Sequence, residues 1–195
     1  MAGAPEKTIS AKRDHLVETA LALFTEGGYH AVGIDTVLAR AGVAKMTLYN
    51  HFASKEDLIV AALARKAEQS AQGLEKFLGD AGADPQAKLL AMFDWMEGWF
   101  RSKDFRGCIY IKAAGEYPKK KDKPNQAALA FKQARVTLLL ELCRQLGVKD
   151  AETLAWQIAM QMEGAIVVAS MHSRPEAAQE AKAAAAVLIE AARRV

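Results

Sequence analysis

The 195-residue sequence is 51% apolar and 25% charged, and its two cysteines, Cys108 and Cys143, are too few for a disulfide-stapled fold. Its formal net charge of +3 is too small to indicate a nucleic-acid partner by itself. No basic start followed by an apolar stretch and a cleavage site opens the chain, and its most apolar windows are too short to span a membrane, so we expect a cytoplasmic protein.

The first predicted element is a helix that begins at Ser10. Residues 1–9 show no periodic pattern and are predicted to be a loose tail. From Leu16 to Phe24, apolar residues recur at spacings of three and four, which is the repeat of one helix face. Gly27 and Gly28 predict its end, because glycine readily adopts the left-handed conformation common at helix termini.

The stretch from Gly33 to Phe52 has the pattern of two short helices separated by a turn. A two-helix DNA-binding motif needs a turn too tight for an ordinary side chain, and Gly42 is predicted to provide it. Five apolar residues are predicted to face inward: Val37, Leu38, Val43, Leu48 and Phe52. The outward side then consists of Lys45, Met46, Thr47, Tyr49 and Asn50, with His51 near its edge. Spacing alone is equally consistent with a three-helix core that has a polar surface.

Total charge does not identify this segment as a DNA-binding one. Through residue 55, six Lys and Arg stand against five Asp and Glu, so this end of the chain is almost neutral. A basic footprint must therefore come from the placement of charges on one face. Lys45 and Lys55 can neutralise phosphates, and Thr47, Tyr49 and Asn50 offer donors to phosphate oxygens or base edges.

The remaining elements are also predicted to be helical. Ser54, with an acidic residue three positions later, predicts the start of a long helix that ends near Gly79 and Asp80. Further helices are predicted near 84–102, 125–146, 150–172 and 175–194, with a short irregular segment at 105–118 and a charged loop at 119–124. No alternating pattern predicts a strand, so the expected fold class is all-α.

Beyond these patterns, the run IDTVLARAGVAKMTLYNHF from Ile34 to Phe52, followed by ASKEDL, resembles the signature of the TetR family of regulators. The first predicted helix and its exit at Tyr29 are similar to the same family, so the resemblance runs nearly continuously from about residue 12 to 60. It implies an N-terminal three-helix helix-turn-helix DNA-binding domain in residues 1–55. A larger C-terminal helical domain, in residues 56–195, would bind a ligand and dimerise.

The resemblance implies which residues touch DNA. Together with Lys45, they are Arg13, Thr36, Arg40, Thr47, Tyr49, Asn50, His51 and Lys55. The sequence departs from the family pattern at three positions: Ala44 replaces the usual serine cap, Met46 stands where glycine is frequent, and Leu38 where alanine is. The missing cap should cost about 1 kcal/mol at that helix. Because Met46 would point at the groove, the operator sequence of relatives does not carry over.

The last two predicted helices are expected to form a homodimer interface. The helix at 150–172 is apolar on two faces, one of which carries Trp156, Met160, Glu163 and Val167, so it must be covered on two sides. The last helix offers a seam of small residues: Ala177, Ala181, Ala184, Leu188 and Ala191. The resemblance implies a four-helix interface between subunits, and the alternative is that both faces are internal to one monomer.

A binding site for a small apolar or aromatic effector is predicted in the second half. Its candidate lining combines large and deformable side chains: Met92, Trp95, Met96, Trp99, Cys108, Tyr110, Phe131, Trp156, Met160 and Glu163. Each of these residues is also consistent with ordinary core. The carboxylate of Glu163 either meets an internal donor, the interpretation we favour, or is kept for a ligand.

Together these features predict a ligand-responsive repressor that binds a palindromic DNA operator as a homodimer, with no cofactor, metal, membrane or catalytic role. The segment from Arg106 to Pro118 is similar to a piece found in a subset of the family, with Gly107, Cys108 and Glu116 as its most characteristic residues. A thiol-based redox regulator that uses Cys108 is the alternative, although a buried inert thiol is favoured. An all-helical enzyme is more remote, because the four histidines have no paired cysteine or metal-ligand spacing.

Overall fold

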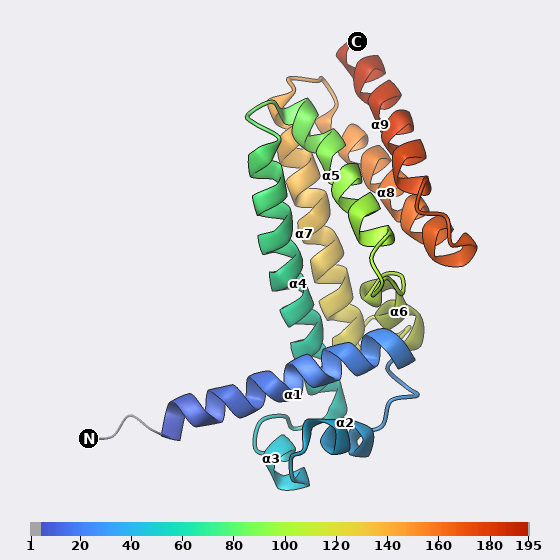
Figure 1. Ribbon diagram of the computed structural model, residues 1–195. Helices are drawn as coiled ribbons and strands as arrows, with labels where there is room; N and C mark the ends of the chain where they lie inside the picture. The colour runs from blue at the N-terminus through green and yellow to red at the C-terminus, as the bar shows by residue number, and fades with distance from the viewer. Residues whose placement is uncertain (1–4, 195) are drawn as a thin grey trace. The chain divides into compact units, whose positions relative to one another are not determined.

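A computed structural model describes the backbone of residues 5–194 and the side chains of residues 11–194. Within this part of the chain all regular structure is α-helical, which confirms the predicted fold class (Figure 1). The helices are α1 (Pro5–Gly27), α2 (Ile34–Ala41), α3 (Lys45–Tyr49), α4 (Lys55–Asp80), α5 (Pro85–Phe100), α6 (Ile109–Glu116), α7 (Lys123–Gln145), α8 (Ala151–His172) and α9 (Ala177–Arg193). Over residues 5–194, no helix combines the length and apolarity needed to cross a bilayer.

The helices divide into two compact units. Unit 1 contains the chain up to Gln69 together with Ile109–Phe131, and unit 2 contains Ser70–Cys108 and the chain from Lys132 onward. The long helices α4 and α7 therefore contribute to both units. The functional boundary predicted between residues 55 and 56 stays a prediction, because it divides the chain by role and not by compactness.

Helix α1 begins earlier than its sequence pattern indicates. Predicted from Ser10, it starts at Pro5, so the expected loose tail is wrong for residues 5–9, while residues 1–4 lie outside the described part. Proline is well tolerated in the first turn of a helix, where no amide partner is required. The apolar face of α1 is buried as predicted, with Leu16 and Phe24 at 1% exposure or less.

The segment expected to be irregular at 105–118 contains a helix, α6, which is tied to the end of α1. The Glu116 carboxylate accepts hydrogen bonds from the backbone N–H groups of Tyr29 (3.0 Å) and His30 (2.5 Å). The Tyr29 hydroxyl donates to the carbonyl of Ile109 at 2.8 Å, and Lys112 Nζ donates to the carbonyl of Thr25 at 3.1 Å. These bonds place α6 in the core of unit 1 beside the exit of α1.

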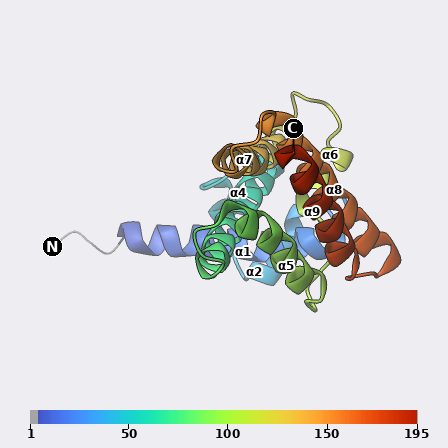
Figure 2. The ribbon, with the colours of Figure 1, turned by 90° about the horizontal axis from the view of Figure 1, so that it is seen from above.

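In unit 2, α5, α8 and α9 pack on one another, and α8 and α9 lie side by side (Figures 1 and 2). The predicted seam on α9 is correct at Ala177 and Ala181, but Ala184 and Leu188 are only half-buried and Ala191 is exposed. The buried row instead runs through Ala178, Ala185 and Ile189, each at 0% exposure. The two alanines of this row, Ala178 and Ala185, let neighbouring helices approach closely.

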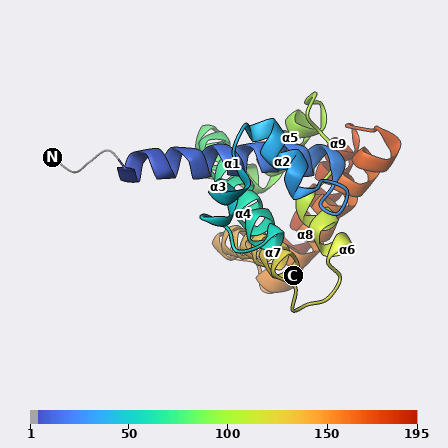
Figure 3. The ribbon, with the colours of Figure 1, turned by 90° about the horizontal axis from the view of Figure 1, so that it is seen from below.

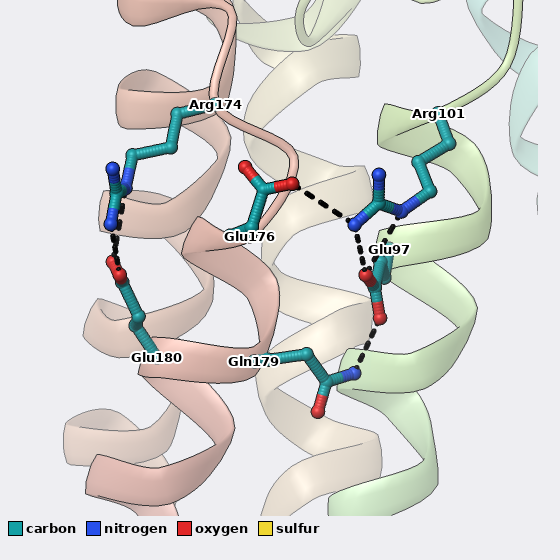
Figure 4. A network of polar contacts seen from close by, with 6 residues as sticks. All are labelled: Glu97, Arg101, Arg174, Glu176, Gln179 and Glu180. Atoms are coloured by element: carbon teal, nitrogen blue, oxygen red, sulfur yellow. Dashed lines mark hydrogen bonds and ion pairs between the residues drawn. The ribbon is translucent and has the colours of Figure 1, made fainter.

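A polar network joins α5 to α9 (Figure 4). Arg101 Nη2 donates to Glu97 (2.8 Å) and Glu176 (3.1 Å), and Gln179 Nε2 donates to the other Glu97 oxygen (2.7 Å). The hydrogen bond from Arg101 holds the pKa of Glu97 below its usual value. Nearby, Lys182 pairs with Asp94 at 2.7 Å; burial works against the charged form of Asp94, yet the bonds from Gln179 and Lys182 still lower its pKa.

Candidate nucleic-acid interface

The turn between α2 and α3 depends on the backbone conformation of Gly42. Gly42 has φ +64° and ψ +34°, the left-handed conformation, and its N–H donates to the carbonyl of Leu38. Val43 N–H donates to the same carbonyl at 3.2 Å, which completes the helix cap. A Cβ at Gly42 would meet nothing within 4 Å, so the turn disfavours an ordinary side chain through its left-handed backbone and not through a neighbouring atom. Glycine is favoured here because of its dihedral angles and not for lack of space.

The inward anchors of the motif lie where the spacing predicts them. Val37 and Leu48 are fully buried, Leu38 and Phe52 are 8% and 4% exposed, and Val43 is half-buried. These side chains hold α3 against the rest of unit 1, and they leave its opposite face free.

The free face of α3 carries the side chains that the sequence predicts to face outward. Met46 is 70% exposed and Tyr49 is 46% exposed, and Lys45 and Asn50 are also exposed. The ribbon of α2 and α3 is seen from below in Figure 3. Thr47 is half-buried, and so is His51, which lies close to the supporting side. An exposed thioether beside an exposed phenol is unusual on a surface without a partner, and both can contact base edges or sugars.

The start of α3 lacks a side-chain cap, as the sequence predicts. Ala44 occupies the cap position with φ −71° and ψ 151°, the extended geometry that a capping residue adopts, but its methyl group accepts no hydrogen bond. Thr47 N–H donates to the carbonyl of Ala44 at 2.9 Å, so the amides of Lys45 and Met46 are the ones available to another acceptor, such as a phosphate oxygen.

By contrast, the start of α4 is capped by its own side chains. Asp57 N–H donates to Ser54 Oγ at 3.1 Å, and Ser54 Oγ donates to the Asp57 carboxylate at 2.9 Å, as predicted for this serine. Lys55 follows the cap and is half-buried; burial lowers its pKa, while the charge of Glu116 opposes that shift. Because Lys55 has already lost part of its hydration, placing its ammonium group against a phosphate costs less desolvation free energy.

Three further predicted DNA-contacting residues lie outside α3, on α1 and α2. Thr36 and Arg40 are exposed on α2, where with Asp35 and Ala39 they line a shallow open hollow. Arg13 on α1 is exposed, with its guanidinium carbon 5.3 Å from the centre of the Phe52 ring. This cation–π contact holds Arg13 close to the end of the motif.

The predicted effector lining is distributed over both units. In unit 2, Met92, Met96 and Cys108 are buried and Trp95 and Trp99 are half-buried. In unit 1, the rings of Tyr110 and Phe131 stack with centroids 3.7 Å apart, and the Tyr110 hydroxyl donates to the carbonyl of Leu63.

The α8 members of the predicted lining have different surroundings. Trp156 and Met160 are 47% and 61% exposed. Both oxygens of Glu163 accept hydrogen bonds from Lys132 Nζ, at 2.6 and 2.7 Å, which confirms the internal partner favoured for this carboxylate. The sequence gives no sign of Lys132, because the pair joins two helices and has no local spacing.

Known proteins match this chain either over part of its sequence or over almost its whole fold. Residues 16–71 match the family described as bacterial regulatory proteins, tetR family. The transcriptional activator FasR of Mycolicibacterium smegmatis is 37% identical over 89 residues, 44% of this chain and 41% of FasR. The transcriptional repressor KstR of Rhodococcus jostii is 47% identical over 58 residues, 30% of this chain and 27% of KstR. The chain thus matches less than half the length of either relative.

Solved structures are similar to this chain over almost its whole length. The crystal structure of SCO4454, a TetR-family transcriptional regulator from Streptomyces coelicolor, superposes with a TM-score of 0.86 at 28% identity. The superposition covers 98% of this chain and 97% of that chain.

Proposed function

Because the chain belongs to the TetR family of transcriptional regulators, we propose that it binds a palindromic DNA operator as a homodimer and represses transcription until a small effector releases it. The observation that carries the DNA-binding part is the two-sided character of α3. Leu48 is fully buried, whereas Met46 and Tyr49 project from the opposite face. A short helix that packs against the protein on one side and exposes its side chains on the other fits a major groove.

The homodimer is supported by a row of exposed apolar side chains on α8. The row consists of Trp156, Met160, Val167 and Met171, exposed by between 42% and 75%. Successive spacings of four, seven and four residues keep these side chains on one helix face over about four turns. Val187 on α9 adds a further apolar side chain, exposed by 69%. A self-complementary apolar surface of this kind is typical of a two-fold interface, which in turn suits a palindromic site.

The effector part of the proposal depends on the large side chains of α5. Met92, Trp95, Met96 and Trp99 lie on this helix, and we propose that they contact a small apolar or aromatic compound. Trp156 and Met160, also predicted to line this site, are better explained by the dimer surface because they are exposed. The effector must act by binding the free and DNA-bound states with different affinity.

The redox alternative receives no support from the placement of the thiols. Cys108 and Cys143 are both free and buried, and burial raises the pKa of Cys143 to about 11. Reactive thiols are partly exposed and have lowered pKa values. The proposed trigger is therefore a bound effector, acting in the cytoplasm where the operator lies.

Selection from a library of random duplexes, with the full-length chain as bait, tests this proposal. We expect enrichment of an inverted repeat with half-sites centred about one helical turn, ~10 base pairs, or a multiple of it apart. Tyr49→Ala should abolish the enrichment, and Phe77→Ala is a matched control that truncates a similarly exposed aromatic residue (38%) in unit 2. A reporter gene behind the selected site then gives the sign of regulation. If no sequence is enriched at any salt concentration, the proposal is wrong.

A further inference from the structure

The net positive charge of the chain belongs to unit 1, as a count of the charged residues in each unit shows. Unit 1 has thirteen Lys and Arg against ten Asp and Glu, whereas unit 2 has thirteen of each, so unit 1 carries the entire +3. Lys119, Lys120 and Lys121, hereafter the lysine run, equal that excess in number. Without the lysine run, unit 1 would be neutral.

The loop that carries the lysine run has a defined conformation. Asp122 N–H donates to the carbonyl of Lys119 at 2.9 Å, which closes a turn. Asn125 Nδ2 donates to the carbonyl of Tyr117 at 2.8 Å and joins the two ends of the loop. The three lysines are exposed, and none of them forms an ion pair with a side chain of residues 11–194.

An ion pair holds this loop beside the start of α4. Lys123 Nζ lies 2.6 Å from the carboxylate of Asp57, which belongs to the first turn of α4 and to its cap with Ser54. Lys121 is two residues from Lys123, so their Cα atoms are at most about 7 Å apart. The lysine run is therefore close in the chain to a residue that is held against the first turn of α4, the turn that also carries Lys55.

Neighbouring carboxylates neutralise the lysine run only in part. Asp57 is paired with Lys123, and Glu116 accepts the amides of Tyr29 and His30. Asp122 within the loop and Glu56 on α4 remain as nearby negative charges. A net positive surface is left around the lysine run.

We propose that the lysine run is an auxiliary phosphate-binding surface that contacts the same duplex that α3 reads. This inference rests on the proposed function. Lysine is a flexible point charge that suits phosphate oxygens irrespective of base sequence. A docking site for an acidic protein fits less well, because lysine is depleted in protein interfaces and Pro118, rather than an aromatic or methionine anchor, precedes the lysine run.

The salt dependence of DNA affinity tests this proposal. The affinity of the full-length chain is measured at several salt concentrations for two duplexes: the selected operator and a mixed-sequence duplex of the same length. The variant Lys119→Gln, Lys120→Gln, Lys121→Gln should have a salt slope less steep by up to about 5.4 for the dimer, because each of the two subunits loses up to three phosphate contacts that contribute about 0.9 each. Between about 50 and 200 mM salt, the wild-type dimer should therefore lose up to about 1,800-fold more affinity than the variant.

Two further variants separate a local contact from an effect of total charge. Replacing all three lysines by arginine should keep the steep slope. Replacing Lys76, Lys103 and Lys149 by glutamine removes three exposed charges from unit 2 and should leave the slope unchanged.

If glutamine at Lys119, Lys120 and Lys121 leaves the salt slope unchanged, the inference is wrong and the proposed function stands. The same conclusion follows if this variant and the unit 2 glutamine variant have equal salt slopes. Loss of a protein partner, with normal DNA binding, would assign the lysine run to protein docking instead. Failure of the wild-type chain to bind either duplex would overturn the proposed function and this inference together.

Discussion

Substitution of Gly42 by alanine tests whether the turn of the DNA-binding motif is defined by backbone conformation. At φ +64°, a residue with a Cβ carries a penalty of roughly 1–2 kcal/mol. No atom lies within 4 Å of that Cβ, so no steric cost adds to it. Gly42→Ala should therefore lower the free energy of unfolding by about 1–2 kcal/mol, and Gly42→Asn by less, because asparagine tolerates this conformation.

Urea denaturation followed by circular dichroism measures this difference, and Gly98→Ala provides a control of opposite sign. Gly98 lies within α5, also has open space around its Cβ position, and has no left-handed φ. Alanine there should raise the free energy of unfolding by up to about 1 kcal/mol. If Gly42→Ala proves neutral, or costs about 4 kcal/mol or more, the dihedral explanation is wrong.

Three further predictions concern the cap, the interface and pH. Ala44→Ser should supply the missing cap of α3 and raise the free energy of unfolding by about 1 kcal/mol, measured in urea, and no gain would show that the first amides of α3 are already satisfied. Met160→Glu should convert the dimer to a monomer in sedimentation, because it places a charge in the proposed apolar interface, whereas a retained dimer would place the interface elsewhere. Because the pKa of Asp94 is lower in the folded than in the unfolded state, its ionised carboxylate stabilises the fold at pH values above the unfolded-state pKa. This contribution is lost as the pH falls through the folded-state pKa. Asp94→Asn should therefore be less stable than the wild type at neutral pH, with a difference that shrinks in acid, and a constant difference in urea melts from neutral to acid pH would contradict this origin.

Patterns with a helical period allowed most of the fold to be predicted. The bounds of α4, α8 and α9 agree with the sequence to within a few residues, and the inward anchors of the motif follow from their spacing of three and four. The beginning of α1 at Pro5 was missed because residues 5–9 have no apolar period, although helix formation does not require one. Along α9, the buried row shifts to Ala185 and Ile189 because helix packing, and not the presence of small residues alone, selects the face.

Contacts between distant parts of the chain could not be predicted in the same way. Glu116 binds the amides of Tyr29 and His30 across 87 and 86 residues, and Lys132 pairs with Glu163 across 31. Neither pair follows a local spacing, so only the folded chain brings the partners together. The reason why glycine is favoured at position 42 could not be predicted either. A sequence shows that glycine is present, but not whether its dihedral angles or its surroundings require it.

Amide hydrogen exchange with and without the selected duplex tests most directly whether the free face of α3 is the DNA-reading surface. We expect the peptide covering residues 44–52 to exchange more slowly when DNA is bound, with smaller protection at 34–41 and none in α5, whose amides belong to unit 2. Unchanged exchange at 44–52 on a duplex that the chain demonstrably binds would contradict this role for α3.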